Sequence, residues 1–173
     1  PFVPYENPCG AYLTDFEYAM NPDAPKAYLN FEGVDSCFYV WLNGQYLGYS
    51  EVSHSTSEFD ITGSVKEGKN TLAVMVLKWC DGSYLEDQDK FRTSGIFRDV
   101  YILSRPENCV RDYFTTMLLD EDEATVRIRF AYNGDVAATK IKVLNSENKT
   151  VATSSVKAFE NGGAYTHQSM LVI

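Results

Sequence analysis

The chain is divided into apolar runs of strand length that end in turn residues, and this pattern constrains its fold more than any other feature. The run Cys37–Leu42 is almost continuously apolar, as expected for a strand buried on both faces. Asn43-Gly44 follows it and precedes a second aromatic run, residues 45–49. An Asn-Gly pair between two such runs favours a type I′ turn, because both central residues of that turn need a positive φ. The sequence therefore predicts a β-hairpin here.

The first hundred residues continue in the same way. Further strands are expected at residues 27–31, 59–61 and 72–77, and residues 61–66 form at most one helical turn. Short strands with a turn signal about every ten residues are typical of a β-sandwich or jelly roll. We therefore expect an all-β protein in which residues 1–106 form a jelly-roll-like β-sandwich.

A polar, proline-containing cluster at residues 104–108 marks the one convincing domain boundary. Beyond it, Val126, Ile128 and Phe130 alternate with polar residues, a pattern of strands that are buried on one face. Residues 107–173 are therefore predicted to form a second β-sandwich. They are fewer than the roughly 100 residues of a typical sandwich of this kind, so we expect this domain to be truncated.

Composition excludes several classes of function. The net charge of −9 disfavours nucleic acid and anionic membrane surfaces as partners, and no apolar run is long enough to span a bilayer. The first ten residues show no signal peptide, although the chain does not begin with Met. The four cysteines are widely separated and lack metal-ligand spacing, which indicates free thiols, a reducing compartment and a cytoplasmic protein. Cys37 is expected to be a small core residue.

A long connection without strand or helical periodicity lies between the apolar run 72–77 and the strand expected at residues 96–103. It is acidic and aromatic, and contains Asp81, Glu86, Asp87, Asp89, Tyr84 and Phe91. Long connections inside compact domains are uncommon, and ordered ones tend to bind ligands. Carboxylates beside aromatic rings suit sugar hydroxyls or a hard cation. The alternative, a solvated acidic loop, is about equally supported by composition alone.

The same connection carries a set of motifs that resembles a known family, the large bacterial β-galactosidases of glycoside hydrolase family 2. The motifs in the connection are Asp81-Gly82-Ser83-Tyr84-Leu85-Glu86-Asp87-Gln88-Asp89 and Ser94-Gly95-Ile96-Phe97-Arg98-Asp99-Val100. Others precede it in the family's order: Glu6-Asn7-Pro8, Phe31-Glu32-Gly33-Val34-Asp35-Ser36, Trp41-Leu42-Asn43-Gly44, Gly48-Tyr49-Ser50 and Ser57-Glu58-Phe59-Asp60. The resemblance is strong over residues 1–106 and weak beyond them.

The resemblance implies the order of the domains and which of them carries the catalytic residues. Residues 1–106 would be the family's sugar-binding jelly roll, and residues 107–173 would begin its immunoglobulin-like domain. Both catalytic glutamates of the family lie in a later barrel domain that this chain lacks. The resemblance therefore implies an inactive part of a retaining β-galactosidase that acts on terminal β-D-galactosides. It further implies a homo-oligomer and a requirement for magnesium and an alkali cation, sodium or potassium.

In this family, an aspartate of the Leu-Glu-Asp-Gln-Asp motif contacts the galactosyl unit and the alkali cation. We assign that role, both substrate binding and metal binding, to Asp89, with Asp87 as the second candidate for substrate. An ionised carboxylate can accept charge-assisted hydrogen bonds from hydroxyls and can ligate a hard cation. The alternative is that Asp89 forms an ordinary ion pair with Arg92 or Arg98. The chain also departs from the family at Phe91, where tryptophan is common, and at Cys80, where serine is.

Two other interpretations remain open: a stand-alone carbohydrate-binding module, and a purely structural pair of adhesion-type sandwiches. An aromatic platform on a sheet face would favour the module, whereas an apolar loop tip that needs a partner would favour the β-galactosidase part. Trp41 and Trp79 are expected to be core residues rather than sugar platforms. Arg98 and Asp99 are expected to form a buried or half-buried ion pair.

Overall fold

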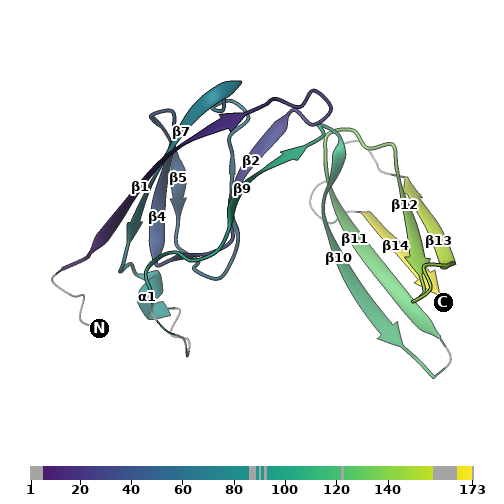
Figure 1. The fold of residues 1–173 in the computed structure, drawn as a ribbon. Helices are drawn as coiled ribbons and strands as arrows, with labels where there is room; N and C mark the ends of the chain where they lie inside the picture. Colours follow the sequence, from purple (N-terminus) through teal and green to yellow (C-terminus); the bar gives the residue numbers. More distant parts are fainter. Residues whose placement is uncertain are drawn as a thin grey trace. The chain divides into compact units, whose positions relative to one another are not determined.

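The computed structural model describes residues 6–85, 89, 91, 93–121, 123–157 and 167–172, without the side chains of 157 and 167–172. The chain divides into two compact units, Pro1–Pro106 and Glu107–Ile173 (Figure 1). Strands dominate both units, and the prediction of an all-β fold is confirmed. In the described part of the chain, no helix is long and apolar enough to cross a membrane.

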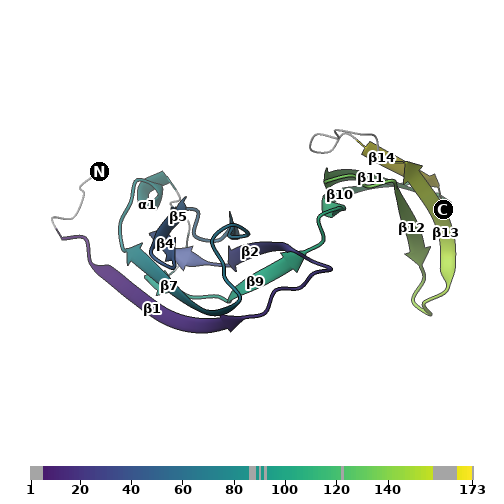
Figure 2. The same ribbon diagram turned by 90° about the horizontal axis from the view of Figure 1, so that it is seen from above.

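The first unit contains two main sheets. One has the strand order β1-β7-β4-β5 (Figure 2). The other has the order β6-β2-β9, and a two-stranded pair, β3-β8, accompanies them. The bounds are β1 Cys9–Tyr18, β2 Lys26–Phe31, β3 Val34–Asp35, β4 Cys37–Leu42, β5 Gln45–Ser50, β6 Ser57–Asp60, β7 Gly68–Leu77, β8 Gly95–Ile96 and β9 Val100–Arg105, with one helical turn, α1, at Gly82–Leu85. All neighbouring strands pair antiparallel.

The core of this unit lies between the two main sheets and follows from the two-residue period of the strands. Phe38, Val40 and Leu42 of β4 point inward and are at most 2% exposed. They pack in one cluster with inward residues of β7 and β2. The ring of Phe38 lies 4.8 Å from that of Phe31, between centroids, so the two sheets meet through aromatic contacts.

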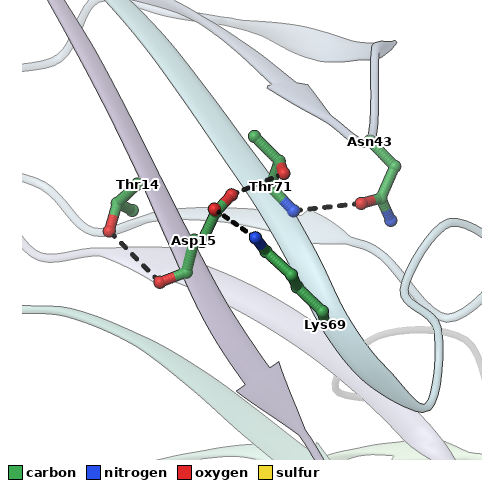
Figure 3. A network of polar contacts seen from close by, with 5 residues as sticks. All are labelled: Thr14, Asp15, Asn43, Lys69 and Thr71. Atoms are coloured by element: carbon green, nitrogen blue, oxygen red, sulfur yellow. Dashed lines mark hydrogen bonds and ion pairs between the residues drawn. The ribbon is translucent and has the colours of Figure 1, made fainter.

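The predicted hairpin is confirmed. Asn43 and Gly44 have φ values of 53° and 82° and connect β4 to β5, as a type I′ turn requires. The Asn43 side chain also accepts a hydrogen bond from the Thr71 N–H at 3.0 Å, which attaches the turn to β7 (Figure 3).

Figure 3 also shows how β1 is attached to β7 on the outer face of the sheet. The Lys69 ammonium lies 2.8 Å from Asp15, and the Thr71 hydroxyl donates to Asp15 at 2.6 Å. These hydrogen bonds, first that from Lys69 and then that from Thr71, lower the pKa of Asp15. The interaction is exposed, so it supports the pairing of the strands but does not dominate the stability of the sheet.

The second unit also has two sheets, β10-β11-β14 and β12-β13. Their bounds are β10 Cys109–Leu119, β11 Ala124–Asn133, β12 Ala138–Leu144, β13 Thr150–Lys157 and β14 His167–Val172. Phe130 and Ile141, from different sheets, form the buried centre of a small apolar cluster. The predicted alternation on β11 is therefore confirmed at Phe130, which is 5% exposed.

Asn70 is the polar residue on which the turn before β7 depends, because it is 1% exposed and fully engaged. Its side-chain oxygen accepts from the Lys66 N–H and from Asn43, both at 2.9 Å. Its amide nitrogen donates to the carbonyl oxygens of Lys66 and Gly68 at 2.7 and 2.9 Å. Buried polar groups that lose such partners are costly.

We expect Asn70→Ala to lower the free energy of unfolding by about 2–4 kcal/mol, because several buried polar groups lose their partners at once. Urea unfolding monitored by tryptophan fluorescence measures the change. Lys69→Ala, at the exposed neighbouring position, is the control and should have a much smaller effect. Equal losses in the two variants would contradict the role assigned to Asn70.

Candidate functional site

Hydrogen bonds hold the first residues of the long connection between β7 and β8, Lys78 and Trp79, which we call its root. The Asn7 side chain donates to the Trp79 carbonyl oxygen at 2.8 Å and accepts from the Trp79 N–H at 2.9 Å. The Lys78 N–H donates to the Pro8 carbonyl oxygen at 3.0 Å. These bonds extend the pairing of β1 with β7 into the connection, so they set the direction in which it leaves the sheet. Asn7 and Pro8 belong to a motif noted in the sequence, but their spacing alone did not reveal this role.

A buried group of hydroxyls then holds the helical turn α1. The hydroxyl oxygens of Ser36 and Ser83 lie 2.6 Å apart, and the two residues are 4% and 8% exposed. Ser83 also accepts from the Cys80 N–H at 3.1 Å, and the Cys80 sulfur lies 3.0 Å from the Ser36 hydroxyl. The start of the connection is therefore packed against β3 and β4 by polar contacts, which a solvated loop would lack.

From the last residue of α1 onward, the connection presents apolar side chains to solvent. Leu85 is 84% exposed and Phe91 is 93% exposed. Asp89 is exposed between them. The connection ends at Gly95, whose φ of 109° suits glycine. A β-carbon at position 95 would lie 2.8 Å from the Tyr12 hydroxyl oxygen, so glycine also allows β8 to approach β1. The site thus combines an anchored root with an exposed, apolar and acidic tip.

The site residues predicted from sequence are only partly within the described structure. Asp89 is exposed, and its role in binding substrate and a cation stays a prediction. Asp87 and Arg92 lie outside the described residues. The Arg98 guanidinium lies 5.4 Å from the centre of the Phe97 ring. This position is a cation–π contact, and Arg98 is exposed.

Two expectations about neighbouring residues are wrong. Arg98 and Asp99 are both exposed, so they form no buried or half-buried ion pair. Both residues lie in the bend between β8 and β9, outside the two strands. Trp79 is only partly buried, and the Lys78 ammonium lies 5.5 Å from its ring centre. Trp41 is also partly buried and belongs to the outer face of its sheet rather than to the core.

A group of possible cation ligands lies beside the root of the connection. Carboxylate oxygens of Glu51 and Asp81 and the Cys80 sulfur all lie within 4.8 Å of one another. The Tyr49 hydroxyl donates to Glu51 at 2.7 Å. Burial, and then this hydrogen bond, raise the pKa of Tyr49. The oxygen atoms suit a hard cation, whereas the thiol does not, so the group as a whole matches neither magnesium nor zinc well.

Cys37 lies on β4 close to this group and is 3% exposed, which confirms it as a core residue. The pKa of its thiol is raised to about 11, mainly by burial, while the hydrogen bond with Tyr49 lowers it and the neighbouring Cys80 raises it. The four cysteines are free thiols, as the sequence predicts. Cys37 is therefore held in its protonated form and is no candidate nucleophile.

The outer face of β4 and β5 carries four aromatic rings: Tyr39, Trp41, Tyr46 and Tyr49. The ring of Tyr39 lies 4.9 Å from that of Tyr49, and the ring of Trp41 lies 5.6 Å from that of Tyr46. Tyr46 is 51% exposed and Tyr49 is 40% exposed. This cluster, which we call the outer aromatic face, was not predicted from the sequence. A sheet face of this kind is what a carbohydrate-binding module would need.

Comparison with known proteins identifies the family. The model described as "Glycosyl hydrolases family 2, sugar binding domain" matches residues 1–106. The chain belongs to glycosyl hydrolase family 2. The resemblance seen in its motifs is therefore confirmed, and the first unit is the family's sugar-binding domain.

Curated relatives of the chain include β-galactosidases. That of Actinobacillus pleuropneumoniae is 48% identical over 153 residues, a match that covers 87% of this chain and 15% of the relative. That of Staphylococcus xylosus is 46% identical over 159 residues, a match that covers 90% of this chain and 16% of the relative. This family 2 chain thus spans about one-sixth of the length of the relatives that it matches.

Solved structures share the fold. A β-glucuronidase of an uncultured Clostridium species gives a TM-score of 0.76 at 22% identity, covering 94% of this chain and 29% of that one. The β-glucuronidase of Bifidobacterium dentium, complexed with coumarin-3-O-glucuronide, gives 0.77 at 19% identity, covering 94% and 32%. At these identities the likeness concerns the fold alone.

The raised pKa of Cys37 predicts a loss of stability in alkali. Below pH 9 the thiol is protonated in both the folded and the unfolded chain. Between about pH 9 and 11 the unfolded chain releases this proton first, so the free energy of unfolding falls. Urea unfolding at a series of pH values should show a shallower fall in Cys37→Ala. Cys109→Ala, in the other unit, should follow the unmodified chain. Parallel alkaline losses with and without Cys37 would contradict this assignment.

Proposed function

We propose that this chain is part of a retaining β-galactosidase that hydrolyses terminal β-D-galactosides, and that it completes the substrate site through residues 81–95. The catalytic carboxylates would lie in a barrel domain outside this chain, so the chain alone would be inactive. The identities of 48% and 46% to curated β-galactosidases support a galactoside, whereas the β-glucuronidases of like fold are 22% identical or less.

The observation that carries this proposal is the contrast within the connection. Its root is fixed by Asn7 and by the buried hydroxyls of Ser36 and Ser83. Its tip exposes Leu85 and Phe91 almost completely. Exposed apolar side chains on an anchored loop are unfavourable in water and suit contact with a second domain. We infer that the tip inserts beside the barrel and so carries Asp89 to the substrate.

Within this proposal, Asp89 binds the galactosyl unit and ligates an alkali cation, sodium or potassium, with Asp87 as the second candidate for substrate. The exposed carboxylate of Asp89 fits the cation chemically, since hard cations take oxygen ligands. One carboxylate cannot complete a coordination shell, so the other ligands would come from the rest of the protein. The family's magnesium would also be held mainly elsewhere, because the group at Glu51 includes a thiol.

The same proposal extends to the second unit and to the assembly. The two sheets of residues 107–173 fit the family's immunoglobulin-like domain in order and in architecture. We expect the whole protein to be a homo-oligomer. The four free thiols suit a reducing compartment, and we therefore propose the cytoplasm.

A stand-alone carbohydrate-binding module is the second candidate function, and the outer aromatic face favours it. Tyr46 and Tyr49 are exposed there beside Trp41. Such a module would bind sugar on its own surface, without any other domain. The two functions therefore differ in the affinity of the isolated chain for galactosides.

We expect lactose to bind the isolated chain with a Kd weaker than about 1 mM, because one exposed carboxylate and a few hydroxyl contacts offset little of the entropy lost on binding. Isothermal titration calorimetry measures this affinity, with Tyr46→Ala as the comparison variant. A micromolar Kd that is lost in Tyr46→Ala would establish the module instead.

In the full-length enzyme, we expect Asp89→Ala to reduce kcat by about 100-fold or more while the protein stays folded, because a preorganised charged group is lost from the transition state. The response of the rate to sodium or potassium should disappear in the same variant. Steady-state kinetics on a nitrophenyl β-galactoside, with and without each cation, measures both effects.

Asp89→Asn tests the effect of charge separately from that of shape. The amide keeps the shape and an oxygen acceptor, but it is neutral and cannot balance the charge of a cation. Asp23→Ala, an exposed aspartate in a turn before β2, is the matched control and should leave the rate unchanged. Full activity with normal cation dependence in Asp89→Ala would overturn the assignment and transfer it to Asp87.

A further inference from the structure

Two thiols, those of Cys37 and Cys80, meet where the connection between β7 and β8 leaves the sheet. Cys37, the first residue of β4, pairs with Leu77, the last residue of β7. Three residues beyond Leu77, the Cys80 sulfur lies 3.0 Å from the hydroxyl oxygen of Ser36, the residue before Cys37. The Cys80 side chain also interacts with the Cys37 thiol through charge and a hydrogen bond. The two thiols are therefore direct neighbours.

The two thiols differ in their access to solvent. Cys37 is 3% exposed, whereas Cys80 is partly exposed. The surroundings of Cys80 hold its side chain in place: the Ser83 hydroxyl lies 3.8 Å from its sulfur, and a β-carbon at Gly82 would lie 3.4 Å from it. A small oxidant in water can therefore reach Cys80 before it reaches Cys37.

The strand order separates Cys37 from Cys9, the other thiol at this end of the sheet. Cys9 of β1 and Cys37 of β4 lie opposite Leu77 on its two sides. Neighbouring strands are about 4.8 Å apart, so the two Cα atoms are about 10 Å apart. A disulfide needs Cα atoms within about 7 Å. Cys80 is thus the thiol that the fold offers to Cys37.

We propose that Cys37 and Cys80 form a redox-sensitive pair, which a peroxide converts into a disulfide that ties the start of the connection to β4. Disulfides in a reducing compartment are usually transient and redox-sensing, so small thiols would reverse this one. The inference concerns the chain's own chemistry and does not depend on the galactosidase function proposed above.

The reaction has two steps. The Cys80 sulfur attacks an oxygen atom of hydrogen peroxide, the O–O bond breaks, and a sulfenic acid and one water molecule form. The Cys37 sulfur then attacks the Cys80 sulfur and the S–O bond breaks. The hydroxyl group leaves with the Cys37 proton as a second water molecule. The two thiols lose two electrons in total, which reduce the peroxide.

The different surroundings of the two thiols suit these different steps. The pKa of Cys37 is about 11, so this thiol is protonated and reacts poorly with molecules in solution. Its contact with Cys80 offsets this disadvantage in the second step, because reactants held together have a high effective concentration. Cys80 is therefore the thiol that meets the peroxide, and Cys37 is the one that closes the disulfide.

Peptide mapping of the chain tests the linkage. The chain is treated with dilute hydrogen peroxide, denatured with an alkylating reagent and digested with trypsin without a reductant. Trypsin cuts after Lys66 and Lys78, so the two cysteines lie on different peptides. We expect a linked pair of peptides that dithiothreitol separates, lighter by two hydrogen atoms than the two peptides together. Full alkylation of both thiols, or a Cys80 sulfinic acid beside an alkylated Cys37, would overturn the proposal.

Two variants test the identity of the thiols. Cys80→Ser keeps a hydroxyl near Ser36 and Ser83 but cannot form a disulfide, so its Cys37 should stay fully alkylated after the same treatment. Cys9→Ser should form the linkage between residues 37 and 80 to the same extent as the unmodified chain. A linkage of Cys37 to Cys9 or to a second chain would contradict the assignment.

Hydrogen exchange tests what the disulfide does to α1. The N–H groups of Ser83 and Leu85 donate to the carbonyl oxygens of Cys80 and Asp81 at 3.1 and 3.3 Å. A covalent bond from Cys80 to β4 limits the opening of this turn, so both amides should exchange about tenfold or more slowly in the oxidised chain than in the reduced one. Peroxide should cause no such change in Cys80→Ser. Equal exchange in the oxidised and reduced chains would overturn the role proposed for the disulfide.

Discussion

The burial of one face of β4 against the sheet β6-β2-β9 is the constraint on which the first unit depends. Phe38, Val40 and Leu42 all point to that face, so a slip of one residue would move all three away from the core. The register of β4 with β7 is therefore fixed, with Cys37 opposite Leu77, the last residue of β7. The candidate loop begins directly after this residue. Its position is thus a consequence of core packing rather than of its own sequence.

The residues at the root of the loop and those at its tip have different roles. Asn7, Ser36 and Ser83 satisfy backbone and hydroxyl groups at its root, where unpaired polar groups would be costly. Leu85 and Phe91 gain nothing from the part of the chain that the structure describes, since they are almost fully exposed. A sequence selected only for the stability of this domain would favour polar residues at these positions. The apolar tip therefore argues for a function in contact with another surface.

The sequence predicted those features that depend on neighbouring residues. The hairpin at Asn43-Gly44 follows from turn chemistry. The run Cys37–Leu42 was expected to be buried on both faces, but Tyr39 and Trp41 on its outer face are only partly buried. The outer aromatic face could not be predicted, because a strand that is apolar on both sides does not reveal which face a second layer covers. Strand β1 was also missed, although Tyr12, Phe16 and Tyr18 alternate, since polar residues interrupt its apolar pattern. The role of Asp89 stays a prediction, because its binding partners would come from outside the chain.

The geometry of the outer aromatic face bears on the choice between the two candidate functions. A sugar ring stacks well on an aromatic surface that is flat over its own width. Here the ring planes of Tyr39 and Trp41, on one strand, are inclined by 29°, but those of Tyr39 and Tyr49 are inclined by 50° and those of Trp41 and Tyr46 by 51°. Rings tilted in this way between the two strands do not form one flat surface across both strands. Trp41, the largest ring, is also partly buried. These rings therefore serve better as a surface that other side chains cover, and the anchored loop with its apolar tip remains the stronger guide to function.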